Sequence, residues 1–180
     1  MIIEIGTSDF RTDAGNVEGI FIEPIKHYFD RLPECKKENV AISNFTGTTT
    51  GYYIDDATIK KHGLNDWIRG CNSINEPHPT VIKLGWEKYQ TTQQIDVVRI
   101  KSIIDKYELK YIDFLKIDTE GHDCIILNDY LDTVSIKPKK IQFENNVLSN
   151  KAEVKILVAR LRGIGYSCTQ VKDDILCKLL

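Results

Sequence analysis

The sequence contains no long uninterrupted apolar run and no run of basic residues. Its 180 residues include 24 lysines and arginines and 26 aspartates and glutamates, spread along the whole length. Nucleic-acid binding usually depends on a concentrated positive patch that binds phosphates electrostatically. The sequence shows no such patch, so we expect no nucleic-acid partner. The first ten residues, MIIEIGTSDF, have no basic segment at their start, and Glu4 and Gly6 interrupt the apolar run. We therefore expect this segment to be neither a signal peptide nor a membrane span. We therefore expect a cytoplasmic protein with no membrane partner.

The cysteines include no CxxC pair. The five are odd in number and widely separated, at Cys35, Cys71, Cys124, Cys168 and Cys177. This pattern supports neither a zinc cage nor a redox motif. Cys124 and Cys168 have apolar neighbours and are interpreted as small core residues, in keeping with a reducing compartment.

The remaining composition is that of an ordinary globular protein, with 42% apolar and 28% charged residues. The length is sufficient to bury a core. No internal repeat or linker divides the chain, which predicts a single domain over residues 1–180. The sequence leaves the oligomeric state open.

Short apolar runs alternate with amphipathic segments. Strands are predicted at residues 1–5, 19–22, 39–43, 111–117 and 140–143, with an edge strand near 47–54 and a closing hairpin at 166–171 and 175–180. Helical spacing marks residues 25–32, 100–107, 123–131 and 154–161. This alternation predicts an α/β fold whose doubly wound, mostly parallel sheet has helices on both faces and a C-terminal antiparallel hairpin strand. Residues 55–95 are expected to form an irregular excursion that serves as a lid or a pocket wall.

Ligands bind such sheets at the carboxyl ends of the strands. The first strand ends at Gly6, which lets backbone N–H groups approach a ligand, and three others end on Glu23, Asp118 and Glu144. Strand-end acids can merely cap the next helix, but several at one crevice favour a binding site. Glu23 lies seventeen residues after Gly6, a spacing that resembles an acid bonded to ribose hydroxyls.

Two phosphate-binding motifs are absent. After the first strand the chain reads GTSDFR, without the further glycines of GxGxxG, and no GxxxxGK[ST] loop occurs. The expected cofactor therefore carries a ribose but needs no diphosphate cradle. S-adenosylmethionine meets this description.

The block KIDTEGHD at residues 116–123 resembles the KIDxEGHE signature of FkbM-type methyltransferases. Residues 4–10, 21–32, 39–54 and 97–127 resemble other parts of that family in the same order. The resemblance runs from Ile3 to about Asn145 and is weakest over residues 55–90. It implies a Rossmann-like class I fold and methyl transfer from S-adenosylmethionine to an oxygen, often of a sugar.

On this resemblance, Glu23 holds the ribose, while the first loop borders the methionine part and the third strand approaches the adenine. The residues assigned to the cofactor are Glu4, Gly6, Thr7, Ser8, Glu23, Pro24, Ala41, Ile42, Ser43 and Asp118. The chain departs from the family at Phe10, where a glycine is usual, and residues 7–18 are too few for a full first helix.

Methyl transfer to a hydroxyl needs a close, collinear acceptor oxygen and a group that removes its proton. Asp118 is our first candidate for this catalytic base and Glu144 the second, although Asp118 could instead only bind the amino group of the cofactor. We expect no metal. As an alternative, Asp118, Glu144 and Asn145 could together bind a divalent cation such as magnesium.

The expected acceptor is a small molecule or a glycan, because an aromatic ring with polar neighbours can seat a sugar. The residues assigned to it are Arg11, His78, Trp86, Glu120 and Asn145. Trp67, Arg69 and Lys83 are further candidates in the same excursion. Alternatively, both tryptophans are buried packing, Glu120 is a helix cap, and His122 is a structural histidine rather than a base.

Two other functions stay open. An N-methyltransferase is disfavoured because it would have an NPPY-like motif that binds a planar amine at residues 118–121. This chain has DTEG there. A catalytically inactive module that binds S-adenosylmethionine or another partner is kept open by the altered first loop.

Overall fold

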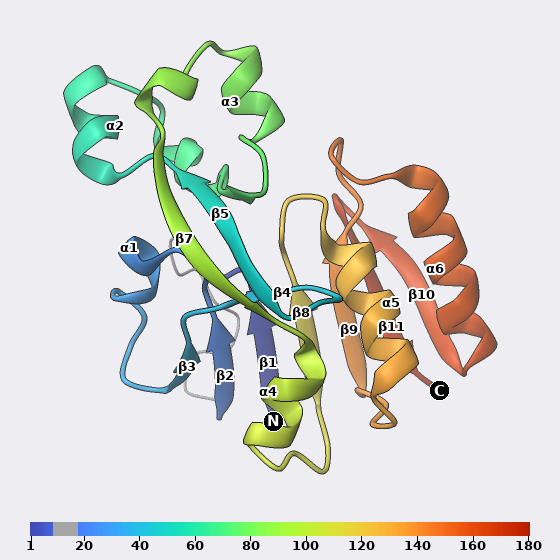
Figure 1. The fold of residues 1–180 in the computed structure, drawn as a ribbon. Coiled ribbons are helices and arrows are strands. Elements are labelled where there is room, and N and C mark those ends of the chain that lie inside the picture. The colour runs from blue at the N-terminus through green and yellow to red at the C-terminus, as the bar shows by residue number, and fades with distance from the viewer. Residues whose placement is uncertain (9–17) are drawn as a thin grey trace.

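The computed structural model describes residues 1–8 and 18–180. The described strands form two sheets (Figure 1). The main sheet has the order β10-β11-β9-β8-β1-β2-β3. Its strands are β1 (Ile2–Ile5), β2 (Gly19–Ile22), β3 (Lys36–Glu38), β8 (Phe114–Ile117), β9 (Lys140–Glu144), β10 (Tyr166–Val171) and β11 (Asp174–Leu179).

The main sheet is parallel from β3 to β9. The hairpin of β10 and β11 closes it, with β11 antiparallel to β9. The predicted fold class, a mostly parallel α/β sheet with a C-terminal antiparallel hairpin strand, is thus confirmed.

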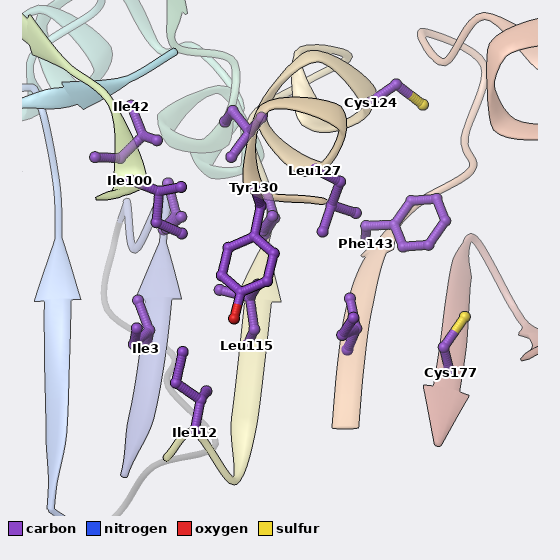
Figure 2. Close-up of a cluster of buried hydrophobic side chains, with 14 of the residues drawn as sticks. Ile3, Ile42, Ile100, Ile112, Leu115, Cys124, Leu127, Tyr130, Phe143 and Cys177 are labelled. Carbon is purple, nitrogen blue, oxygen red and sulfur yellow. The ribbon is translucent and has the colours of Figure 1, made fainter. Parts of the chain in front are cut away.

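Three helices pack together on one face of the main sheet: α4 (Ile100–Lys106), α5 (Asp123–Thr133) and α6 (Lys151–Gly163). Side chains from these helices and from the strands form the main core, including Ile3, Leu115, Leu127, Tyr130 and Phe143 (Figure 2). Over β1 and β2 the opposite face is covered near α1 (Lys26–Phe29), where Phe29 and Leu32 pack with Phe21. These apolar faces anchor the strand ends that build the site.

The second sheet has the order β4-β7-β5-β6. It consists of β4 (Ala41–Ile42), β5 (Gly47–Tyr53), β6 (Ser73–Ile74) and β7 (Thr91–Val98). The strand predicted at 39–43 is present as β4, but it belongs to the second sheet and not to the main sheet. The edge of that sheet is the polar β3, and Ala41 and Ile42 pair with β7 instead. A strand at the edge of a sheet can be polar. The apolar run at 39–43 therefore did not mark the edge strand of the main sheet.

Residues 55–90, which we call the lid, are more regular than expected. They contain α2 (Asp56–His62), α3 (Pro79–Lys83) and 3₁₀ turns at Asp66–Gly70 and Glu87–Tyr89. Their short apolar runs converge on a small core of Ile59, Ile68, Cys71 and Val81, which Ile54 joins from the residue just before the lid. The long antiparallel pair β5 and β7 carries the lid above the carboxyl ends of the main sheet (Figure 1).

Cys168 and Cys177 form a disulfide across the terminal hairpin. Both side chains are buried, as expected for Cys168, but their pairing was not foreseen. The register places these residues directly opposite one another on β10 and β11, where β-carbons come close. Cys35, Cys71 and Cys124 are free thiols.

The helices in the described part of the chain are all too short or too polar to cross a lipid bilayer.

Candidate functional site

The candidate site lies where the strand order of the main sheet reverses. The chain leaves β1 toward β2 on one side, and β8 later returns to its other side. In parallel sheets this reversal opens a crevice at the carboxyl ends of the strands. A cavity of about 290 Å³ is found there, and this volume is near the lower end of the range for small-molecule binding sites.

Gly6 forms the floor of the cavity. Its φ is +80°, and a β-carbon added to it would lie 1.8 Å from the carbonyl oxygen of Asp118. Its N–H donates to the carbonyl of Ile22, and the N–H of Asp118 donates to that of Ile5. Only glycine allows the ends of β1, β2 and β8 to meet this closely.

Glu23 lines the cavity at the end of β2 with a side chain that is almost fully buried. One carboxylate oxygen accepts a hydrogen bond from the N–H of Ser8 at 2.7 Å, and the other from the N–H of Ile25 at 2.8 Å. Burial outweighs these bonds and raises the pKa of Glu23 to about 7. Each oxygen retains a lone pair, so the carboxylate can also accept from ligand hydroxyls.

Glu4 and Lys116 form an ion pair in the cavity wall. They are neighbours on β1 and β8, with Lys116 Nζ 2.9 Å from a carboxylate oxygen of Glu4. Glu4 was assigned from the sequence, whereas Lys116 was missed. Its position in the KIDTEGHD block was the available signal, but the pairing depends on the register of two strands far apart in sequence.

Asp118, Glu120 and Glu144 converge at one end of the site. One carboxylate oxygen from each lies within 4.8 Å of the other two. Burial, with repulsion from neighbouring carboxylates, raises the pKa of Asp118 to about 7 and that of Glu144 to about 9. Asp118 and Glu120 line the cavity, and Glu144 supports them by accepting a 3.0 Å hydrogen bond from the N–H of Glu120.

Asp123 holds this end of the site together from within the protein. Its buried carboxylate accepts hydrogen bonds from the N–H of Thr119 at 3.0 Å and the N–H of Glu144 at 2.8 Å. The strand ends of β8 and β9 are thereby tied to the start of α5. Sequence reasoning interpreted Asp123 only as a helix start and missed this role.

The lid forms the remaining wall. The hydroxyl of Ser8 donates to the carbonyl of Arg69 at 2.9 Å, and Asn72 Nδ2 donates to the same carbonyl at 2.8 Å. This contact brings the 3₁₀ turn Asp66–Gly70 against the first loop. The lid residues that line the cavity are Asp66, Trp67, Arg69, Gly70, Asn72, Ser73 and Ile74.

The two lid residues that were assigned to the acceptor lie behind the wall. His78 is 2% exposed and contacts Glu120, with 3.3 Å between His78 Nε2 and a carboxylate oxygen. Trp86 stacks on Trp67, the residue that reaches the cavity, with ring centroids 6.2 Å apart. Both can influence the cavity only through these neighbours.

The remaining assigned residues divide into three groups. The residues that line the cavity are Thr7, Pro24, Ala41 and Ile42. Ser43 does not line it, but its hydroxyl lies 3.0 Å from Nε2 of His122, which does. Burial lowers the pKa of His122, so its ring favours the neutral form. Arg11 and Phe10 lie outside the described residues.

The side chain of Asn145 is bonded to residues of β10 and α6. Its side-chain amide donates to Gln170 at 2.6 Å, and its oxygen accepts from Lys151 at 2.8 Å. The carboxylates that lie together are those of Asp118, Glu144 and Glu120, the last of which was not in the predicted metal set.

The charge of the cavity favours a cation. Among the described residues its wall contains five carboxylates, at Glu4, Glu23, Asp66, Asp118 and Glu120. Arg69 and Lys116 are the basic side chains in the same wall. An excess of carboxylate attracts a positively charged ligand and repels a phosphate.

Residues 5–168 match the model of a family described as the methyltransferase FkbM domain. A solved structure described as the methyltransferase FkbM from Methylobacillus flagellatus KT shares the fold, with a TM-score of 0.56 and 15% sequence identity. The match covers 98% of this chain and 42% of that one, so this chain spans less than half of that protein's length. No curated protein sequence matches this chain.

Proposed function

The chain belongs to the FkbM methyltransferase family, and from this premise we propose that it transfers a methyl group from S-adenosylmethionine to a hydroxyl group of a sugar or glycan. The observation that carries the proposal is the buried carboxylate of Glu23, held by two backbone N–H groups beside the Gly6 turn. A buried acceptor at this strand end fits the hydroxyls of a ribose.

The residues present fit this cofactor in three respects. Gly6 leaves a space that a β-carbon would fill. The excess of carboxylate suits the positive charge of a sulfonium. Two buried oxygens of residues in the wall, Thr7 Oγ1 and Asn72 Oδ1, have no hydrogen-bond partner among the described residues, as in a site for a polar ligand.

Glu23 would hold the ribose, with Ala41 and Ile42 against the adenine and the loop from Gly6 to Ser8 along the methionine part. Bound S-adenosylmethionine supplies a methyl group on a sulfonium sulfur, open to attack by an oxygen. The residues of this chain position that oxygen and manage its proton.

Asp118 is the proposed base. Its pKa of about 7 leaves a usable fraction ionised at neutral pH, and a carboxylate with a raised pKa is a stronger base. Glu144, with a pKa of about 9, keeps its proton at neutral pH and would act as a hydrogen-bond donor instead. Two neighbouring acids whose pKa values differ can thus take different roles.

The direct test is calorimetric titration with S-adenosylmethionine, followed by a methyl-transfer assay on a panel of glycans. We expect binding and transfer to a hydroxyl. Binding without turnover on any acceptor would favour an inactive binding module, methylation of an amine would favour an N-methyltransferase, and absence of binding would overturn the proposal. Loss of turnover in a metal chelator would favour a cation at Asp118, Glu120 and Glu144.

A further inference from the structure

We propose that His78 is a positioning residue, which holds the carboxylate of Glu120 in the cavity wall so that Glu120 can accept a hydrogen bond from the acceptor. The inference rests on the proposed function. It assigns to the lid a defined role in acceptor binding, through one contact between the lid and the loop that follows β8.

The contact is buried on the histidine side and open on the glutamate side. His78 is 2% exposed, whereas the Glu120 side chain is 23% exposed and lines the cavity. The ligand therefore meets Glu120, and His78 stands behind it. This arrangement is that of a supporting side chain rather than of one that touches substrate.

The hydrogen bonds of His78 define where its proton lies. Nδ1 accepts a hydrogen bond from the N–H of Thr80 at 3.1 Å, at the start of α3. A ring nitrogen that accepts carries no proton, so the proton is on Nε2 and is donated to Glu120 at 3.3 Å. The backbone of α3 thus orients the imidazole toward the glutamate.

Glu120 is held at its backbone as well. Its φ of +53° is in the left-handed region, and its N–H donates to Glu144 at 3.0 Å. A non-glycine residue keeps this conformation only where its surroundings enforce it. The backbone of Glu120 is bonded to β9 and its side chain is bonded to the lid. These two contacts restrict the Glu120 carboxylate to one orientation.

That direction places Glu120 beside the proposed base. Carboxylate oxygens of Asp118 and Glu120 lie within 4.8 Å of one another. While Asp118 takes the proton of the reacting hydroxyl, Glu120 can accept from another hydroxyl of the same acceptor. The structure therefore favours acceptors with at least two nearby hydroxyls, and the contribution of His78 should appear in acceptor affinity rather than cofactor affinity.

The kinetic test compares His78→Ala, His78→Gln and the matched control His62→Ala, which changes an exposed histidine of the same lid. We expect His78→Ala to raise the KM for the acceptor roughly tenfold or more, since a hydrogen bond to a charged group is lost. The dissociation constant for S-adenosylmethionine should stay unchanged. Glutamine, which can donate through its amide, should restore much of the KM, and His62→Ala should behave like the wild type.

A double-mutant cycle tests that His78 acts through Glu120. The variant that combines His78→Ala with Glu120→Gln should have the acceptor KM of Glu120→Gln alone, because the two residues share one interaction. Additive effects would overturn the proposal.

A second readout needs no turnover. In ¹⁵N–¹H NMR of the ligand-free protein, His78 should show the Nε2-protonated tautomer, and Glu120→Gln should shift its Nε2 resonance. A proton on Nδ1, or no response to Glu120→Gln, would overturn the proposal. If the wild type turns over and His78→Ala keeps the wild-type KM, only this inference fails. If the wild type methylates no hydroxyl, the proposed function fails and this inference with it.

Discussion

Gly6 lies so close to Asp118 that a β-carbon on the glycine would be 1.8 Å from the aspartate's carbonyl oxygen. The two residues follow β1 and β8, the strands between which the crevice opens. One backbone contact thus sets the distance between the first loop, where the cofactor would bind, and the proposed base.

We predict that Gly6→Ala lowers the free energy of unfolding by roughly 3 kcal/mol or more, because it combines a left-handed φ with a backbone clash. Urea unfolding measures this loss. Gly63→Ala is the matched control, since Gly63 has a φ of +62° but no atom within 4 Å of an added β-carbon. The control should cost only about 1 kcal/mol, and equal losses in the two variants would show that the clash is relieved.

Glu23→Ala should weaken S-adenosylmethionine binding by roughly ten- to a hundredfold, because the ribose loses a charged acceptor and the N–H groups of Ser8 and Ile25 lose their partner. Calorimetric titration gives the affinity, and circular dichroism checks the fold. The control is Glu18→Ala, which removes an exposed carboxylate paired with Lys36. Wild-type affinity in Glu23→Ala would remove Glu23 from the ribose site.

Asp118→Asn should lower kcat by about a hundredfold or more, since the amide cannot accept a proton. The melting temperature should stay equal or rise, because the substitution removes a carboxylate from the neighbourhood of Glu120 and Asp123. Steady-state kinetics and thermal unfolding separate the two effects. Turnover at the wild-type rate would exclude Asp118 as the base.

The ligand-free protein should lose stability as the pH rises from about 4 to about 9. Burial raises the pKa of Glu23 and Asp118 to about 7 and that of Glu144 to about 9, from ordinary values of 4.5, 3.8 and 4.5. Over this range the folded state keeps protons that the unfolded chain has released, so the free energy of unfolding falls with increasing pH. Urea unfolding at pH 5 and pH 8 measures the difference.

Glu144→Gln should flatten this pH dependence, because the amide does not titrate. Glu87→Gln, at an exposed glutamate of the lid, should leave it unchanged. Stability that increases between pH 5 and pH 8 would contradict the assignment of buried, protonated carboxyls to this site.

Part of the site follows from sequence order alone. Gly6, Glu23 and Asp118 each come directly after an apolar strand, and parallel strands bring their carboxyl ends to one edge. The lid could not be derived in this way. Its core joins short apolar segments from residues 54 to 81 without a clear period, so neither helix nor strand spacing was visible.

The difference between sequence order and tertiary packing also explains which site residues the sequence analysis misplaced. His78 and Trp86 have the chemistry of acceptor-binding residues, but burial behind Glu120 and Trp67 is decided by packing. Asn145 directly follows β9, yet its amide is directed to Gln170 on the terminal hairpin.

The sequence by itself determined most strands of the main sheet, their order along the chain and the acids at their ends, because these depend on residues that are close together in the chain. It did not indicate the polar β3 or the long β7, which pair only in the folded protein. The tertiary structure alone decided which side chains meet across the sheet and the lid. Glu4 pairs with Lys116, Cys168 with Cys177, and His78 with Glu120. Each of these contacts depends on strand register or on the docking of the lid, and a shift of one residue in a strand would move its side chains to the other face.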